Sequence, residues 1–247
     1  MIGKKRVLGI IPARGGSKGL PRKNVLDLAG KPMIAWSIAA AADSQFIDRC
    51  IVSTDDEEIA AVARKHGCEV PFMRPAEHAR DHSTTLDVAL HALDELQGFD
   101  LVVILQPTSP LRSTHDIDQT IEAIVAHQAP SAVSVYEPAK SPYWSYRTND
   151  DGRLVSLLDK ELASRRRQEL PAAYVLNGAV YVARVDWLRQ NRRFVTDETV
   201  AHVMPAERSL DVDTAFDLKL VTFYMQQNRI ENRNNTGQAD NALAANA

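Results

Sequence analysis

The chain has 247 residues, 45% of them hydrophobic, and a formal net charge of −3. This length predicts one main domain with a substantial core, and the small net charge excludes an overall bias toward nucleic acid or anionic membranes, so any basic site must be local. Two cysteines, Cys50 and Cys68, match no zinc-ligand spacing, and no apolar run approaches the ~20 residues that span a bilayer. We therefore expect a cytoplasmic protein with free thiols and with no nucleic-acid or membrane partner.

Apolar runs of strand length alternate with segments of helical period through the first half of the chain. This alternation predicts βα units and an α/β fold with a mostly parallel central sheet. The expected elements are strand 6–11, helix 32–42, strand 50–53, helix 56–66, strand 69–73, helix 83–96, strand 101–105, helix 114–127 and strand 132–136. The run at 101–105 is almost entirely apolar, which is typical of a central strand covered on both faces.

The composition changes after Glu137, where aromatic, polar and charged residues mix. We predict a small inserted lobe over about 138–175, with a turn at Asn149 to Gly152 between two possible strands. Strand character returns at 179–182, and a final amphipathic helix is expected over 214–225. The main domain is thus expected to cover 1–225, and the polar segment 226–247 to be a disordered tail.

The stretch IIPARGGSKGLPRKN at 10–24 follows the first predicted strand and contains four cations, Arg14, Lys18, Arg22 and Lys23. Loops at the carboxyl edge of an open α/β sheet bind ligands, and glycine lets backbone N–H groups approach phosphate oxygens. Four cations match the charge of a nucleoside triphosphate, although a solvated basic loop has the same composition. The loop fits neither the P-loop nor the dinucleotide-binding pattern, which argues against an ATPase or a dehydrogenase.

Further motifs follow in the order VSTDD (52–56), RPAEHARDHSTT (74–85), LQPTSPLR (105–112), NGAVY (177–181) and SLDVDTAFDL (209–218). Together with the first loop they resemble the acylneuraminate cytidylyltransferase family, the CMP-sialic acid synthetases, over about residues 6–225. The resemblance implies a Rossmann-like nucleotidyltransferase fold with a small inserted dimerisation lobe. It also implies a homodimer that transfers CMP from CTP to the anomeric hydroxyl of a sialic-acid-like 2-keto sugar acid, releasing pyrophosphate.

The resemblance assigns a set of nucleotide-binding residues around the first loop. Arg14 and Lys23 would hold the triphosphate of CTP, and Arg74 would lie near the cytosine. The expected contacts as a whole are Arg14, Gly15, Gly16, Ser17, Lys18, Lys23, Asn24, Arg74, Thr84 and Thr85. For Arg74 the alternative is an ordinary surface salt bridge.

Asp211 and Asp213 are two residues apart, so on a strand both carboxylates would point to one face and share a hard cation. In the family that the chain resembles, this pair holds Mg²⁺. The alternative is that Asp213 caps the following helix. Asp55 and Glu58 have capping-box spacing, so we expect Asp55 to be structural.

With Mg²⁺ as cofactor, the resemblance gives catalytic roles to Arg14, Lys23, Asp211 and Asp213. No covalent nucleophile is needed, because phosphoryl-type transfer relies on positioning and charge neutralisation.

The expected sugar contacts are Gln106, Arg167, Asn177, Tyr181 and Phe194. Arg167 would reach the sugar carboxylate from the lobe of a partner subunit, unless it belongs to a solvated basic patch. Asn177 and Gly178 also have the sequence of a hairpin turn.

Which sugar is used stays open between neuraminate, legionaminate, pseudaminate and other nonulosonates, because Trp144 stands where neuraminate-specific relatives often carry lysine. A 3-deoxy-manno-octulosonate-type cytidylyltransferase and a non-catalytic nucleotide-binding regulatory module are the alternative functions.

Overall fold

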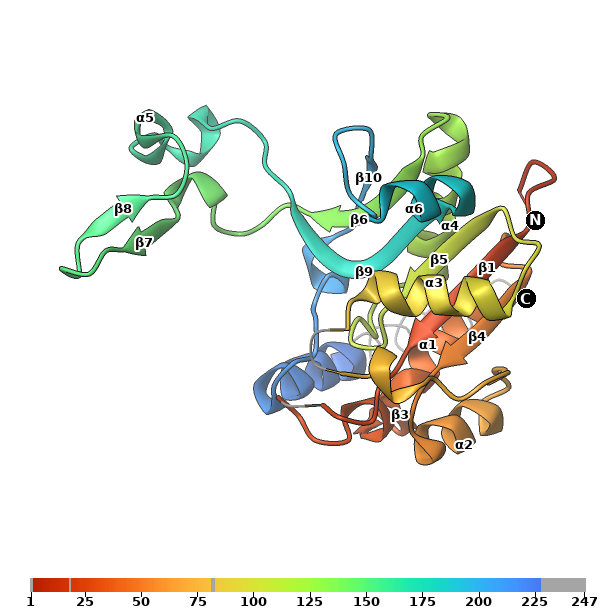
Figure 1. The fold of residues 1–247 in the computed structure, drawn as a ribbon. Coiled ribbons are helices and arrows are strands. Elements are labelled where there is room, and N and C mark those ends of the chain that lie inside the picture. The colour runs from red at the N-terminus through yellow and green to blue at the C-terminus, as the bar shows by residue number, and fades with distance from the viewer. Residues whose placement is uncertain (1, 18, 81–82, 228–247) are drawn as a thin grey trace, which may run out of the picture.

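The computed structural model has a sheet as its middle layer, with helices on both faces (Figure 1). It describes residues 2–17, 19–80 and 83–227, and within these ranges the sheet has six strands in the order β10-β6-β9-β5-β1-β4. Neighbouring strands are parallel except at β9, which runs antiparallel to both β5 and β6. The mostly parallel α/β fold predicted from the alternation of apolar segments is confirmed.

The sheet strands are β1 (Val7–Pro12), β4 (Arg49–Ser53), β5 (Leu101–Leu105), β6 (Ser131–Tyr136), β9 (Val175–Arg184) and β10 (Val200–Val203). The helices of the main body are α1 (Met33–Ala42), α2 (Glu57–Lys65), α3 (Thr85–Glu95), α4 (Thr114–Ala126) and α6 (Val185–Asn191), and residues 215–227 are also helical. Shorter elements are β2 (Asp27–Leu28), β3 (Lys31–Pro32), η1 (Lys23–Val25), η2 (Ala76–His78) and η5 (Ala206–Arg208).

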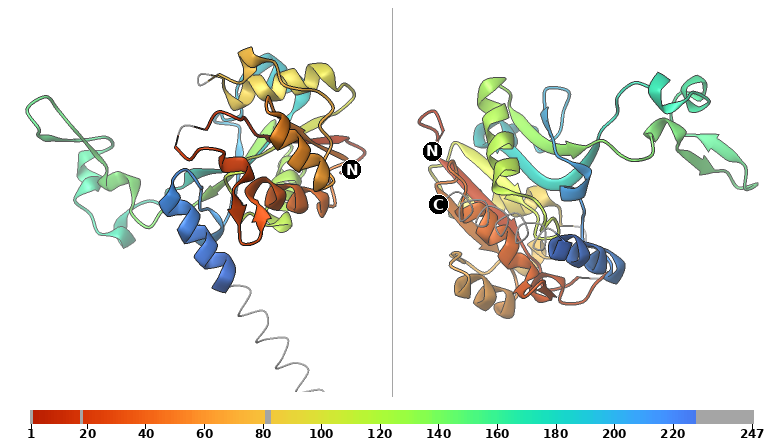
Figure 2. Two further views of the ribbon diagram at one scale, coloured as in Figure 1. Left: turned by 90° about the horizontal axis from the view of Figure 1, so that it is seen from below. Right: turned by 180° about the vertical axis from the view of Figure 1, so that it is seen from behind.

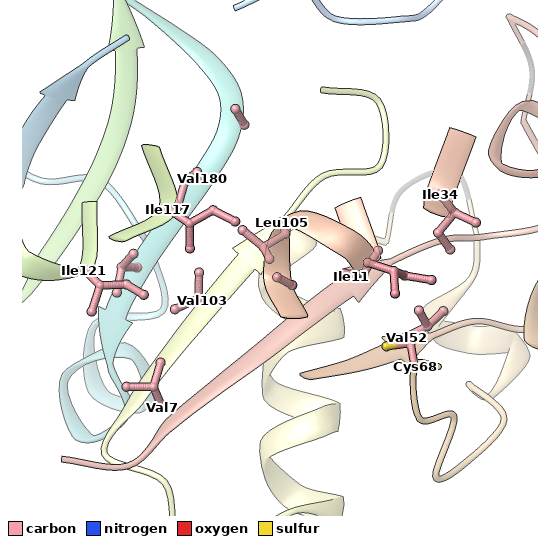
Figure 3. Close-up of a cluster of buried hydrophobic side chains, with 14 of the residues drawn as sticks. Val7, Ile11, Ile34, Val52, Cys68, Val103, Leu105, Ile117, Ile121 and Val180 are labelled. Atoms are coloured by element: carbon pink, nitrogen blue, oxygen red, sulfur yellow. The ribbon is translucent and has the colours of Figure 1, made fainter. Parts of the chain in front are cut away.

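Successive side chains of β1 and β5 point to opposite faces of the sheet, and all five residues of β5 are buried. Val7 and Ile11 join a core with α1, α2 and α4, whereas Leu8 and Ile10 pack in a second core with α3 and α6. Figure 3 shows part of the first core. The central strands therefore hold the carboxyl edge of the sheet in place between two packed layers.

Local capping decides where helices α2 and α3 begin. Helix α3 starts at Thr85 rather than at the predicted residue 83, because Thr84 and Asp87 form a capping box ahead of it. Helix α2 is capped by Asp56, whose carboxylate accepts a hydrogen bond from the backbone N–H of Ile59 at 3.0 Å. The prediction that Asp55 caps this helix is therefore wrong by one residue.

Two other expectations about strands need correction. Residues 69–73 make only isolated bridges, from Ile51 to Glu69 and from Thr54 to Met73, because Pro71 between them has no N–H to donate. Asn177 and Gly178 lie inside β9 rather than in a hairpin turn. Gly178 takes a positive φ of 74° there, and the pairing with β6 shifts register nearby. The sequence patterns gave no prediction of β10 or α6.

Between β6 and β9 the chain leaves the sheet. It forms the hairpin of β7 (Tyr146–Thr148) and β8 (Leu154–Ser156), with η3 (Pro142–Trp144), α5 (Lys160–Ala163) and η4 (Arg167–Glu169). Figures 1 and 2 show this lobe projecting away from the main body. The predicted turn closes the hairpin, since Gly152 donates its N–H to the carbonyl of Asn149 at 2.9 Å.

The predicted tail extends into residues 228–247, which lie outside the described part of the chain. Across the residues that are described, no helix has the length and apolar character needed to cross a membrane.

Candidate functional site

A cleft of about 290 Å³ opens at the carboxyl ends of β1 and β5. The chain runs from β1 to β4 on one side and then crosses to β5 on the other, which makes this the switch point where open α/β sheets bind ligands. The cleft brings together nine of the predicted site residues: Arg14, Ser17, Lys23, Asn24, Arg74, Thr84, Thr85, Gln106 and Asp213. Side chains from five separate segments of the sequence thus converge at one place.

The glycine-rich loop forms one wall of the cleft and is tied at its two ends. The buried Asn24 donates from Nδ2 to the carbonyl oxygen of Arg14 at 3.1 Å. Lys23 donates from Nζ to Oδ1 of Asp213 at 2.8 Å, so a cation and a carboxylate from opposite ends of the sequence meet here. Predicted residue Lys18 lies outside the described residues.

Gly15 and Gly16 do not line the cleft. Gly15 faces the other side of the loop, where its N–H donates to Oδ1 of Asp55 at 3.0 Å. A Cβ at Gly15 would lie 2.6 Å from Oδ2 of Asp56, whereas no described heavy atom lies within 4 Å of a Cβ at Gly16. Only the first of the two glycines is therefore required by close packing.

Arg22 behaves differently from the other cations of the loop. Its guanidinium forms a bidentate contact with Asp56, at 2.5 and 3.1 Å, and also contacts Glu58. Arg22 therefore binds acidic residues at the start of α2. The expectation that all four loop cations face a triphosphate is wrong for Arg22. Its backbone is left-handed, with φ 57° and ψ 22°, a conformation that costs a non-glycine residue roughly 1–3 kcal/mol.

Arg74 is a buried arginine in the wall of the cleft, with 5% of its surface exposed, so the alternative of a surface salt bridge does not hold. Its backbone N–H bonds to Thr54, and its Nη2 lies 3.8 Å from Oδ1 of Asp55. Nε and Nη2 find no hydrogen-bond acceptor among the described residues. Burial lowers the pKa of Arg74, opposed by the charge of Asp55 and reinforced by that of Arg14. Both donors are buried, so Arg74 lies in the wall of the cleft with hydrogen-bonding capacity that the described residues do not satisfy.

The opposite wall of the cleft is neutral and polar. Thr84 caps α3, and Thr85 accepts a hydrogen bond at Oγ1 from Nε2 of Gln106 at 3.2 Å. The backbone of Gln106 is also fixed, because its carbonyl accepts from Nη1 of Arg112 and from Oγ of Ser37. An amide held in this way is suited to hydroxyl recognition.

Asp211 and Asp213 lie in a loop rather than on a strand, and of the two only Asp213 lines the cleft. Val212 between them is fully buried and donates its N–H to Thr108 at 2.8 Å. The helix that follows is capped by Thr214 and Asp217, which exchange hydrogen bonds at 2.8 and 3.3 Å, so the alternative role of Asp213 as a cap is wrong. Desolvation raises the pKa of Asp211, against a hydrogen bond from Thr108 and with the negative charge of Asp213 adding to it.

Of the residues expected at the sugar, Gln106 lines this cleft, whereas Asn177, Tyr181 and Phe194 are not part of its lining. Asn177 is buried, and its amide accepts from Oγ of Ser134 at 2.6 Å and donates to Oγ of Ser209 at 3.0 Å. Tyr181 packs against Phe194 with ring centroids 5.6 Å apart. Desolvation and the charge of nearby Asp211 raise the pKa of Tyr181. The amide of Asn177 is thus already hydrogen-bonded within the protein. Tyr181 packs against Phe194 on one side and is close enough to Asp211 to feel its charge.

Arg167 lies in the projecting lobe, away from the cleft of its own chain. Its guanidinium bonds to Glu137 at 2.9 Å and to the carbonyl of Ala139 at 3.3 Å, where the lobe joins the body. A second, smaller cavity of about 60 Å³ is lined by Glu137, Arg167 and Leu170, among others.

Arg112 is a buried residue of the site that the sequence did not reveal. It donates from Nη1 to the carbonyls of Gln106 and Ala179 at 3.1 and 2.9 Å, which fixes the end of β5 against β9. Burial lowers its pKa to about 10. An arginine after a proline-rich turn carries no signal of burial, because one of the carbonyls that accept from it, that of Ala179, belongs to a distant segment.

The switch-point cleft, its cationic wall and the sheet order together define a nucleotide-binding protein with the nucleotidyltransferase fold. In agreement, a solved CMP:2-keto-3-deoxy-manno-octonic acid synthetase complexed with CTP superposes with a TM-score of 0.70, at 21% identity, over 90% of this chain and 99% of that one. At this identity the likeness concerns the fold alone. The model of the cytidylyltransferase family matches residues 8–230, and the chain belongs to this family.

Curated relatives resemble the chain along almost its whole length. A CMP-N,N'-diacetyllegionaminic acid synthase of Legionella pneumophila is 35% identical over 91% of this chain and 98% of its own length. A pseudaminic acid cytidylyltransferase of Campylobacter jejuni is 33% identical over 90% of this chain and 97% of its own. An N-acylneuraminate cytidylyltransferase of Escherichia coli O18:K1:H7 is 31% identical over 92% of this chain, which matches 54% of that protein.

Proposed function

We propose that the protein transfers CMP from CTP to the anomeric hydroxyl of a nonulosonic acid, with release of pyrophosphate. The observation that carries this proposal is the cleft that gathers Arg14, Lys23 and Arg74, in a chain whose relatives are named for three different nonulosonic acids. We place the reaction in the cytoplasm, where CTP is made.

In the proposed reaction the anomeric oxygen attacks the α-phosphorus of CTP. A new P–O bond forms, the bond to the β-phosphate breaks, its electron pair leaves with pyrophosphate, and the proton of the hydroxyl is released to water. Arg14 and Lys23 neutralise charge on the triphosphate, with Gly15, Gly16, Ser17, Lys18 and Asn24 in the same cradle. Arg74, Thr84 and Thr85 bind the nucleoside part. Arg74 supports this proposal, because its Nε and Nη2 have no hydrogen-bond acceptor among the described residues.

Mg²⁺ is the proposed cofactor, held by Asp211 and Asp213. The donor set fits it: the two carboxylates are hard oxygen ligands, the charge of Asp213 acts on Asp211, and Mg²⁺ commonly binds one or two carboxylates together with substrate phosphates. Among the described residues there is no larger cluster of metal-ligating side chains that would favour another metal. When bound, the ion would neutralise phosphate charge during the transfer. Lys23, 2.8 Å from Asp213, would orient that carboxylate.

The sugar is proposed to lie toward Gln106, Asn177, Tyr181 and Phe194. Arg167 would supply a cation to the sugar carboxylate from the lobe of a second copy, in a homodimer. The lobe supports an interface, because it exposes Tyr146, Leu154, Leu157 and Leu158, with 69% of Leu154 accessible. Asn177 would have to exchange an internal hydrogen bond to reach a sugar, so its contact is the least direct of the set.

Pyrophosphate release with CTP and Mg²⁺ tests the proposal against neuraminate, legionaminate, pseudaminate and 3-deoxy-manno-octulosonate. We expect turnover with a nonulosonate. Turnover restricted to 3-deoxy-manno-octulosonate would support the alternative function. CTP binding without turnover on any sugar would contradict an enzymatic role.

A further inference from the structure

The acidic pair Asp55 and Asp56 lies on the side of the glycine-rich loop that faces away from the cleft. Asp55 receives the N–H of Gly15 at 3.0 Å, and Asp56 receives the guanidinium of Arg22 in a bidentate contact. Neither carboxylate lines the cleft. We infer that Asp55 and Asp56 form an acidic clamp that holds the loop in its CTP-binding conformation before CTP arrives, and that they are positioning residues for the proposed function.

The clamp is tightly packed at both of its contacts. A side chain of any size at Gly15 would collide with Asp56, since a Cβ would lie 2.6 Å from its Oδ2. Arg22 is held in a left-handed backbone conformation that is unfavourable for arginine, and its pairing with Asp56 compensates for the strain. The pairing also raises the pKa of Arg22 and lowers that of Asp56, as expected when each ion stabilises the other.

Each contact of the acidic clamp neighbours a residue that faces the cleft. Gly15 follows Arg14, Arg22 precedes Lys23, and the two ends of the loop are joined by the hydrogen bond from Asn24 to Arg14. Asp55 also lies 3.8 Å from Nη2 of Arg74, on the facing segment. One dipeptide at the end of β4 therefore restrains the positions of all three arginine and lysine side chains in the wall of the cleft.

Electrostatics gives the clamp a second effect. Arg14 and Arg74 repel each other when CTP is absent, since the charge of Arg14 lowers the pKa of Arg74, and the charge of Asp55 opposes this effect. Asp55 thus offsets the repulsion from behind the loop, without lining the cleft where the phosphates are proposed to bind. Without the clamp, only a fraction of molecules would hold the binding-competent loop, and the apparent dissociation constant would rise by the inverse of that fraction.

Two substitutions release the clamp with little other damage. Asp56→Asn keeps an oxygen that caps α2 at Ile59 but removes the charge that pairs with Arg22. Arg22→Gly keeps the left-handed backbone, which glycine adopts freely, and removes the guanidinium. Glu69→Gln is the matched control, because Arg49 and Glu69 form a similar exposed pair, 2.6 Å apart, at the other end of β4.

The test measures CTP binding by isothermal titration calorimetry without sugar, together with KM and kcat. We expect each clamp variant to weaken CTP binding roughly tenfold, the double variant to lose no more than either alone, and KM to change more than kcat. Glu69→Gln should bind CTP as the wild type does. Trypsin should cut within residues 14–23 faster in Asp56→Asn than in the wild type, and added CTP should slow the cutting.

The outcomes separate the clamp from the function on which it rests. A wild type that does not bind CTP would contradict the proposed function, while the trypsin comparison would still test the clamp. Wild-type CTP affinity in Asp56→Asn, an equal loss in Glu69→Gln, or unchanged cutting of the loop would each overturn the clamp.

Discussion

Asp213 lies in the loop ahead of the last helix and Asp217 in its first turn, where the Asp217 carboxylate accepts the backbone N–H of Asp213 at 3.1 Å; the two carboxylates have different partners. Asp213 contacts Lys23 and lines the cleft, with its side chain 69% exposed, whereas Asp217 caps the helix through Thr214. We expect Asp213→Ala to lower Mg²⁺-dependent turnover by on the order of 100-fold with little change in stability. Turnover and thermal unfolding, measured on the same preparation, check both statements.

Asp217→Ala is the matched control for this prediction. It should cost about 1 kcal/mol of stability through the lost cap, and should leave most of the turnover. Full activity in Asp213→Ala would contradict the proposed metal site, and so would a loss explained by unfolding.

The two adjacent glycines of the loop provide a second residue-level prediction. Gly15→Ala places a methyl group against Asp56 and must displace the loop, so CTP binding should weaken roughly tenfold or more. Gly16→Ala meets no described atom within 4 Å and should lose less affinity. Equal losses in the two variants, measured by calorimetry, would show that packing against Asp56 does not set the loop conformation.

For individual residues, the sequence predicted which side chains belong to the site better than it predicted which partners they contact. Arg14, Lys23 and Arg74 meet in one cleft as the motifs indicated, because motif order along parallel strands determines which loops share an edge. Arg22 was counted with the cations that match a triphosphate, since four cations in one loop give no sign of which one faces an acidic neighbour, and Asp55 was taken as the helix cap in place of Asp56. Asn177 looked like a turn residue, yet its partners Ser134 and Ser209 come from distant segments.

Among the elements, α4 and η5 are joined by a buried ion pair. Asp116 is inaccessible to solvent and accepts two hydrogen bonds from Arg208, at 2.9 and 2.8 Å. Burial disfavours its ionisation, but hydrogen bonds from His202, Arg208 and Ser113 outweigh this and hold the pKa of Asp116 well below its usual range. Because η5 is followed closely by Asp211, the ion pair of Asp116 and Arg208 also anchors the segment that carries Asp211 and Asp213.

Asp116→Asn should lower the free energy of unfolding at pH 7 by about 2 kcal/mol, a modest value for a buried pair because Arg208 is 37% exposed. The wild-type carboxylate stabilises the fold above the ordinary pKa of an unfolded aspartate, near 4, and this advantage is lost as the pH falls below it. Denaturant unfolding at pH 7 and pH 3 should therefore show the difference between wild type and variant narrowing at pH 3. A constant difference would contradict the assignment.

Helices and strands with a strong local sequence pattern were predicted well, whereas those with a weak pattern were missed. Strand β5 was predicted with its observed bounds, because an unbroken apolar run needs cover on both faces, and α4 began at its predicted residue. Strand β10 has a partly exposed side-chain pattern at the edge of the sheet, and such a short segment does not differ from a loop in composition. Its place beside β6 is decided by tertiary contacts.

For the whole molecule, the projecting lobe leads to a prediction about assembly. If Arg167 completes the site of a second copy, Arg167→Ala and Asp213→Ala chains should each be inactive alone but complement one another when mixed. Random pairing would restore about a quarter of wild-type activity, because half of the dimers would contain one intact site. Light scattering should give a dimer for the wild type.

Two results would contradict this assembly. A wild-type monomer at assay concentration would remove the interface, and an inactive mixture of the two variants would place Arg167 outside the partner's site. Leu154→Glu on the exposed lobe serves as a further check, since a charge on an interface side chain should shift the protein toward monomer.

The proposed transfer of CMP is tested most directly by the product balance of one reaction with CTP, Mg²⁺ and a nonulosonic acid. The products are separated by ion-exchange chromatography and identified by mass spectrometry. Attack at the α-phosphorus predicts one CMP-sugar and one pyrophosphate for each CTP consumed. CDP with inorganic phosphate, or pyrophosphate with free CMP and no sugar conjugate, would contradict the account.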